Sequence, residues 1–185
     1  MSCVRGAVHN PSESDKPITI RTDLRPGDIG QIIYWHGVLY GREHGLDYTL
    51  EAYVAESLAE FVLNHGEDRQ RLWIASRNST VVGSVGVVPR EGGAAQLRWF
   101  WVHPECRRQG LGHRLLELAL GFARKQGFSR LHLWTFSELE DASRLYREAG
   151  FVRTKERTQR IWGRRLTEER YDLVLEARAE SRGGD

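Results

Sequence analysis

The segment 102–112, VHPECRRQGLG, constrains the fold of this chain more than any other. It follows an apolar run, 97–102, which predicts a strand buried on both faces. Apolar residues then recur at helical spacing up to Gly127, so an amphipathic helix should follow. The chain therefore passes from the carboxyl end of a strand through a tight basic turn into a helix N-terminus. Free backbone N–H groups and the positive end of the helix dipole meet there, which predicts an anion site.

The glycine spacing of this turn narrows the kind of anion. The Walker pattern, in which Lys and Ser or Thr follow the second Gly, is absent, and the dinucleotide pattern fails because Leu115 replaces its third Gly. What remains is Arg107-x-x-Gly110-x-Gly112, which resembles the acetyl-CoA pyrophosphate loop of the GCN5-related N-acetyltransferases (GNAT). The alternative interpretation is a Gly-rich surface turn beside a solvated charge cluster.

A second motif, DASRLYREAGF at 141–151, predicts a short helix that follows a strand. Asp141 can cap its N-terminus and Gly150 its C-terminus. The segment resembles the closing motif of the GNAT family, in which the residue corresponding to Tyr146 lies near the thioester sulfur. Leu139 stands where the family often has an Asn that contacts the pantetheine arm, so the resemblance does not carry that contact over. The resemblance covers roughly residues 18–175 and extends to the acetyltransferase domains fused to bacterial MarR-type regulators.

The resemblance implies a set of residues for acetyl-CoA, which would be the acyl donor. Backbone groups at the end of the strand would pair with the pantetheine arm, and the turn and the first helical residues would hold the phosphates. Tyr146 is the candidate general acid, because a phenol with a pKa of about 10 stays protonated at neutral pH and can donate to a developing thiolate. Its alternative role is to pack a short helix onto the sheet. The implied cofactor residues are Phe100, Trp101, Val102, Arg107, Arg108, Gln109, Gly110, Leu111, Gly112 and His113.

A general base for the acceptor amine is less well defined by the sequence. Glu43 is the first candidate, since it ends a predicted helix next to the Gly45 break, with His44 and Glu138 as alternatives. His36 falls on the apolar stripe of that helix and reads as a core or rim residue. Each acidic candidate could equally be a solvated surface group. The candidate wall of the acceptor pocket comprises Tyr40, His44, Trp99, Trp134 and Phe136.

The order of predicted elements is strand, two helices, three strands, helix, strand, helix and two strands. It predicts an α/β (α+β) fold with a mixed sheet and helices on both faces. The resemblance adds that the sheet is mostly antiparallel and has a central V-shaped splay. We expect one N-acetyltransferase domain at 18–176 between flexible tails at 1–17 and 177–185. The predicted elements lie near 18–21, 26–44, 47–64, 72–75, 81–88, 97–102, 111–127, 131–136, 141–150, 151–159 and 171–175.

The composition of the chain limits which kinds of partner it is expected to bind. A net charge of +2 over 185 residues argues against nucleic-acid binding through a broad basic face. Cys3 and Cys106 have no metal-ligand spacing, and no apolar stretch is long enough to cross a membrane, so we expect no metal, no membrane and a cytoplasmic protein. A homodimer is compatible with the sequence.

Two classes of function follow from these observations. The first is an acetyl-CoA-dependent N-acetyltransferase acting on a primary amine of a small molecule or amino acid, with a peptide or protein N-terminus as another possible acceptor. The second is a non-catalytic acyl-CoA sensor or interaction module that uses the same pocket. Tyr146 favours the enzyme, and the lack of an acceptor base would favour the sensor.

Overall fold

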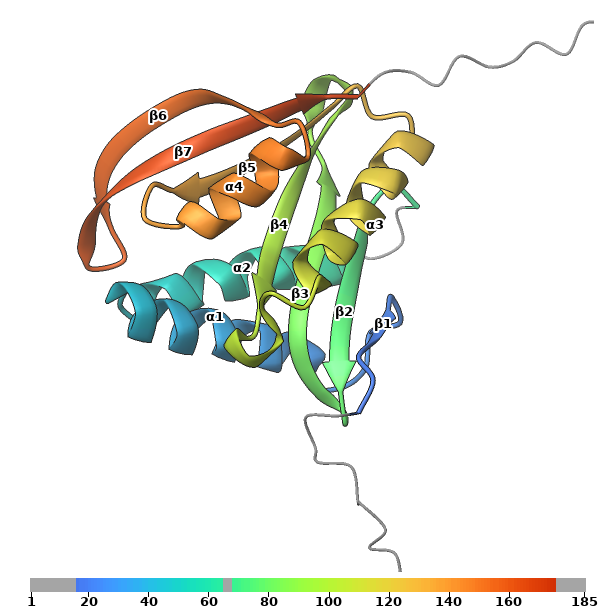
Figure 1. The fold of residues 1–185 in the computed structure, drawn as a ribbon, viewed down its shortest axis with the longest axis vertical. Helices are drawn as coiled ribbons and strands as arrows, with labels where there is room; N and C mark the ends of the chain where they lie inside the picture. The colour runs from blue at the N-terminus through green and yellow to red at the C-terminus, as the bar shows by residue number, and fades with distance from the viewer. Residues whose placement is uncertain (1–15, 65–67, 176–185) are drawn as a thin grey trace, which may run out of the picture.

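The computed structural model describes residues 16–64 and 68–175, which form a sheet with helices on both faces (Figure 1). The strands are β1 (Thr19–Arg21), β2 (Arg71–Arg77), β3 (Thr80–Pro89), β4 (Ala94–Val102), β5 (Arg130–Phe136), β6 (Val152–Ile161) and β7 (Arg164–Val174). The helices are α1 (Asp28–His44), α2 (Thr49–Leu63), α3 (Leu111–Lys125) and α4 (Glu140–Glu148), with short 3₁₀ turns at Glu91–Gly93 and Pro104–Cys106. The predicted mixed fold is therefore confirmed. The predicted tails lie outside the described residues except for Lys16 and Pro17, as does Glu176 at the end of the predicted domain.

The sheet has the strand order β1-β2-β3-β4-β5-β7-β6, and all neighbours are antiparallel except β4 and β5. These two parallel strands pair only at their first residues, from Ala94 opposite Arg130 to Gln96 opposite His132. Beyond that point β4 stays with β3, while β5 stays with β7 as far as Phe136. The sheet therefore splays open between β4 and β5, as the resemblance implied.

Each face of the sheet buries its own core. On one face, α3 and α4 pack their apolar stripes against the sheet around Leu115, Ala119 and Tyr146. On the other face, α1 and α2 bury a second cluster around Ile32, Leu58 and Ile74. The two helix pairs thus cover opposite faces of the sheet (Figure 1).

A bulge in β4 bends this strand at the splay. The pairing of β3 with β4 shifts by one residue between Ser84 and Gly86, and Trp99 takes a left-handed φ of 49°. The Ser84 hydroxyl donates to the Trp99 carbonyl at 2.6 Å. Gly86 is required opposite the bulge, because a Cβ there would lie 2.6 Å from Cε3 of Trp99. A bulge of this kind increases local twist and redirects side chains.

Contrary to the sequence prediction, the segment 97–102 is not buried on both faces, because buried and half-buried side chains alternate along β4. Trp99 and Trp101 are buried in the core under α1 and α2. Phe100 and Val102 are only half-buried and border the other core. Phe100 and Val102 lie on the stretch of β4 that has no neighbouring strand on its β5 side within the described residues.

Two other local expectations differ from the structure. Asp141 does not cap α4, because the helix begins at Glu140 after Leu139; Asp141 lies in the first turn and pairs with Arg144. A carboxylate there still interacts favourably with the helix dipole. The last two strands are longer than predicted and meet in a tight hairpin turn at 162–163. No helix of the described residues is long and apolar enough to cross a membrane.

Candidate active site

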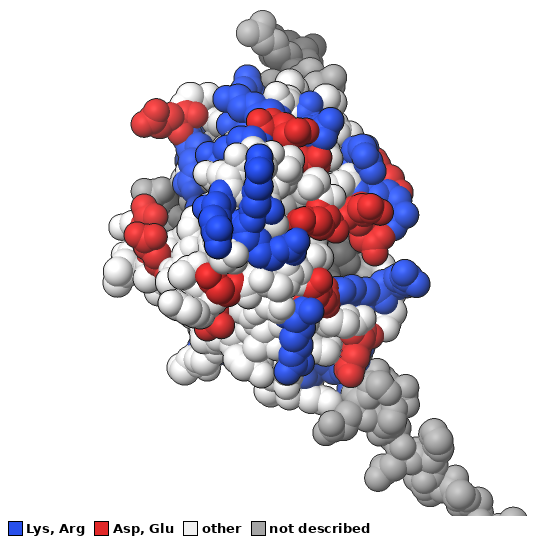
Figure 2. Space-filling model, turned by 90° about the vertical axis from the view of Figure 1, so that its left-hand side faces the viewer, with Lys and Arg blue, Asp and Glu red and all other residues white. Residues whose placement is uncertain are grey.

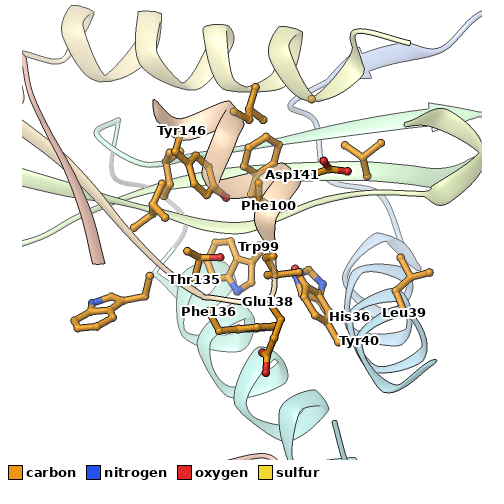
Figure 3. Close-up of a pocket in the computed structure, with 18 of the residues that line it drawn as sticks. His36, Leu39, Tyr40, Trp99, Phe100, Thr135, Phe136, Glu138, Asp141 and Tyr146 are labelled. Atoms are coloured by element: carbon orange, nitrogen blue, oxygen red, sulfur yellow. The ribbon is translucent and has the colours of Figure 1, made fainter. Parts of the chain in front are cut away.

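A cavity of about 860 Å³ opens where β4 and β5 separate. Its walls come from α1 and α2 on one side of the sheet and from α4 and the start of α3 on the other, so it passes through the splay (Figure 3). The volume is in the range of small-molecule and cofactor sites. The cavity has a basic, glycine-containing end near α3 and an aromatic end near β5 and the β6–β7 hairpin.

The basic end lies at the N-terminus of α3. Gly110 occupies the N-cap position with a left-handed φ of 79°, and no side chain caps the helix. The first-turn N–H groups are therefore available to an anion, and the helix dipole adds a positive potential. A Cβ at position 110 would meet no atom within 4 Å, so space does not require glycine there. The left-handed backbone conformation is what favours glycine at this position.

Cys106 precedes this helix but is not a reactive thiol. Its side chain is buried in the core under α3, and burial raises the pKa of the thiol. A thiol that stays protonated is a poor nucleophile.

Most of the predicted cofactor residues face the cavity, but three do not. Trp101 is buried in the core under α1 and α2, and Leu111 is buried under α3, so only their backbones remain available to a ligand. The Gln109 side chain donates to the Glu105 carbonyl at the surface. The residues that line the cavity are Phe100, Val102, Arg107, Arg108, Gly110, Gly112 and His113.

An ion pair joins the basic turn to α1. One guanidinium nitrogen of Arg107 lies 2.9 and 3.0 Å from the two carboxylate oxygens of Glu43. Arg107 also donates from Nε to the Val102 carbonyl at 3.1 Å. The guanidinium thus connects the end of β4 with the last turn of α1. In this arrangement Glu43, the first candidate base, serves as a partner for Arg107.

Tyr146 projects from α4 into the middle of the cavity. Its ring packs at about 6 Å from the rings of Phe100, Phe151 and Tyr171, and only 6% of the residue is exposed. Burial raises the pKa of the phenol well above its ordinary value of 10, so the hydroxyl stays protonated throughout the neutral range. The hydroxyl is directed into the cavity toward Phe100 (Figure 3) and has no hydrogen-bond partner among the described residues. It is therefore free to donate to a ligand.

His36 is a cavity residue that the sequence interpretation placed in the core or at its rim. It is buried on α1 and also lines the cavity. Its Nδ1 lies 2.8 Å from the Ile32 carbonyl, and because a carbonyl oxygen only accepts, Nδ1 must carry the proton. Burial lowers the pKa of His36 to about 4, so the ring is neutral at pH 7. Such a ring is a weak base toward an ammonium group.

The other candidate bases lie near the aromatic end. Glu138 lines the cavity and lies 3.6 Å from a guanidinium nitrogen of Arg164. His44 also lines it and contacts the ring of Phe136. Within residues 16–64 and 68–175, no group of three or more His, Cys, Asp or Glu could hold a metal ion.

All five predicted pocket-wall residues line the cavity: Tyr40, His44, Trp99, Trp134 and Phe136. The ring of Phe136 lies 5.8 Å from Tyr40 and 5.6 Å from His44. Burial is the main reason that the pKa of Tyr40 rises to about 12. Sequence reasoning missed Arg98, Tyr53 and Glu168, which also line the cavity. The sequence offered a signal only for Arg98, which directly precedes the predicted wall residue Trp99.

Comparison with known proteins agrees with this architecture. The Acetyltransferase (GNAT) family model matches residues 29–151. The uncharacterized N-acetyltransferase YjgM of Escherichia coli is 30% identical over 139 residues, covering 73% of this chain and 81% of that protein. Human N-acetyltransferase 8 is 35% identical over 97 residues, which cover 50% of this chain and 43% of that protein, so the match spans less than half of the human relative.

Solved structures share the fold at low sequence identity. An acetyltransferase of the GNAT family from Staphylococcus aureus superposes with a TM-score of 0.70 at 20% identity, covering 86% of this chain and 100% of that chain. The protein yncA of Salmonella typhimurium, solved with its cofactor acetyl-CoA, superposes with a TM-score of 0.63 at 23% identity, covering 88% of this chain and 96% of that chain.

Proposed function

Because the chain belongs to the acetyltransferase (GNAT) family, we propose that it transfers an acetyl group from acetyl-CoA to the primary amine of a small molecule or amino acid. The observation that carries this proposal is the open edge between β4 and β5, which leads directly to the uncapped N-terminus of α3. An extended arm and a diphosphate, joined in that order, match these two features.

The residues present fit acetyl-CoA. The edge of β4 beyond Gln96 offers backbone groups that no neighbouring strand of the described chain uses, at Phe100 among others. The Val102 carbonyl on this edge accepts from Arg107 and becomes available when Arg107 turns away. The first turn of α3 offers N–H groups, and Arg108 adds a positive charge without a carboxylate partner among the described residues. Bound acetyl-CoA would supply an acetyl thioester, whose carbonyl carbon accepts the amine.

Tyr146 is proposed as the general acid. Its hydroxyl is protonated at neutral pH, lies in the cavity and is not engaged elsewhere in the described structure. It can donate its proton at the sulfur as the carbon–sulfur bond breaks. The surrounding aromatic rings of Phe100, Phe151 and Tyr171 hold the phenol in one position.

Glu43 is proposed as the base that takes the amine proton. It lines the cavity beside Tyr40 and His44, at the boundary between the basic and aromatic ends. Both carboxylate oxygens of Glu43 accept from Arg107, so this role requires Arg107 to turn toward the phosphates. The pair is partly exposed and contributes little to stability, so exchanging it for a phosphate contact costs little.

The alternatives are an acyl-CoA sensor and an enzyme that acts on a peptide or protein N-terminus. Tyr146 supports catalysis over sensing, and an acceptor end bordered by α1, α2 and the hairpin turn supports a small acceptor over a polypeptide. Likeness to the domains fused to MarR-type regulators, a homodimer and a cytoplasmic location stay predictions of the sequence.

The test is a screen of primary amines with acetyl-CoA, read as release of free thiol, followed by Tyr146→Phe. This variant removes only the hydroxyl and should lower kcat by roughly 10²–10⁴ with acetyl-CoA affinity little changed. The matched control is Tyr171→Phe, whose hydroxyl lies in the same core, donates to Glu169 at 2.9 Å and does not line the cavity. If no amine is acetylated while acetyl-CoA still binds tightly, the sensor function replaces the enzyme.

A further inference from the structure

The aromatic end of the cavity contains an arginine that the proposed function does not use. Arg98 projects from β4 just before the bulge and lines the cavity together with Tyr53 of α2 and Trp162 of the hairpin turn. Its guanidinium carbon lies 5.3 Å from the ring centre of Tyr53 and 5.4 Å from that of Trp99. The two aromatic faces therefore hold the guanidinium in place.

The arginines of the cavity differ in their partners. Arg107 pairs with Glu43, and Arg144 pairs with Asp141. Arg98 and Arg108 have no carboxylate partner among the described residues. Arg108 lies at the phosphate end of the cavity, where an anion is expected. Arg98 lies at the opposite, acceptor end, on the face of the sheet under α2.

Aromatic rings form the wall of the cavity beside Arg98. The Tyr53 and Trp162 rings lie 5.5 Å apart, and Phe136 is 6.5 Å from Trp162. Glu168 of β7, an acidic residue that also lines the cavity, already accepts from Arg157 at 2.7 Å. The face of the molecule shown in Figure 2 carries a central group of Lys and Arg side chains with acidic side chains around it.

We propose that the acceptor is an amino carboxylate with an apolar or aromatic side chain, whose carboxylate binds Arg98. This proposal rests on the proposed acetyltransferase function and specifies its substrate class. A planar guanidinium matches a carboxylate with two parallel hydrogen bonds. Tyr53, Phe136 and Trp162 then contact the apolar side chain. The carboxylate anchors one end of the acceptor, leaving its amine to reach the thioester near Tyr146.

The experiment compares L-phenylalanine with phenylalaninamide and phenethylamine as acceptors. Phenylalaninamide and phenethylamine lack the carboxylate but keep the aromatic ring and the primary amine. The amino group of phenylalaninamide is less basic than that of phenylalanine, so it loses its proton at least as easily. In the wild type, kcat/KM for the amino acid should exceed that for the amide by about tenfold or more. Arg98→Met keeps an unbranched side chain between the two rings and should abolish this preference. Arg124→Met, which removes one exposed charge on α3, is the matched control and should keep it.

Equal kcat/KM for the amino acid and the amide in the wild type, or equal losses for both in Arg98→Met, would overturn the proposal. A second measurement does not depend on turnover. N-acetylphenylalanine should bind the protein more tightly than its amide, by NMR titration without acetyl-CoA, and Arg98→Met should remove the difference. If this difference is seen but no amine is acetylated, the acetyltransferase function fails and the carboxylate site stands. If amines are acetylated but N-acetylphenylalanine and its amide bind equally well, only the proposed carboxylate site fails.

Discussion

Protonation of His36 should destabilise the protein in mild acid. The buried ring has a pKa of about 4 in the folded state, against its ordinary value of 6.5 in the unfolded chain. Between these two values the unfolded chain binds more protons than the folded one. Stability from this group is therefore present above pH 6.5 and is lost as the pH falls toward 4.

The size of the effect follows from the two pKa values. For a single group, the linkage relation gives a loss of about 2 kcal/mol in the free energy of unfolding between pH 7 and pH 5. Urea denaturation at both pH values measures it. His36→Phe keeps a ring beside Tyr40, at a centroid distance of 5.8 Å in the wild type, but cannot be protonated. This variant should lose about 2 kcal/mol less than the wild type between the two pH values.

His132 also titrates low, with its pKa lowered to about 4 mainly by burial, so the wild type loses stability through two histidines. In His36→Phe, only the part of the pH-dependent loss of stability that is due to His36 should disappear. The control is His113→Asn, which removes a histidine whose side chain is 64% exposed, so that the loss of a buried histidine is compared with the loss of an exposed one. A wild type and a His36→Phe variant with the same pH dependence would refute a neutral, buried His36.

Further changes test the two ends of the cavity. Gly110→Val forces a β-branched residue into a φ of 79° and should weaken acetyl-CoA binding at least about tenfold by calorimetry, with circular dichroism unchanged. Arg108→Ala should weaken the same binding at low salt and less at high salt, because exposed charges are screened; equal affinities at low salt would make Arg108 a solvated residue. Glu43→Gln should lower kcat by about 10² at pH 7 and recover as the pH rises and the amine deprotonates, whereas unchanged kcat would restrict Glu43 to its contact with Arg107.

Local features of this protein were predictable from the sequence. The Gly110 turn, the amphipathic helix α3 and the end of α4 shortly before Gly150, where φ is 92°, follow from side-chain periodicity and from backbone angles that glycine adopts most readily. These signals act over a few residues, so the chain shows them before any tertiary contact is known. The predicted cap at Asp141 was wrong because α4 begins two residues earlier, with Leu139 at the N-cap position, and a shift of one or two residues at a helix end costs little.

The arrangement of the site depended on tertiary structure. Hydrophobic periodicity does not say that β5 pairs with β7 along its whole length and with β4 for only three residues, although this difference creates the splay. Nor does it place the bulge at Trp99, which separates Arg98 and Trp99 from the half-buried Phe100. Glu43 reaches Arg107 across 64 positions of sequence. Such contacts result from competition among strand edges and side chains that are distant in the chain, so no local pattern encodes them.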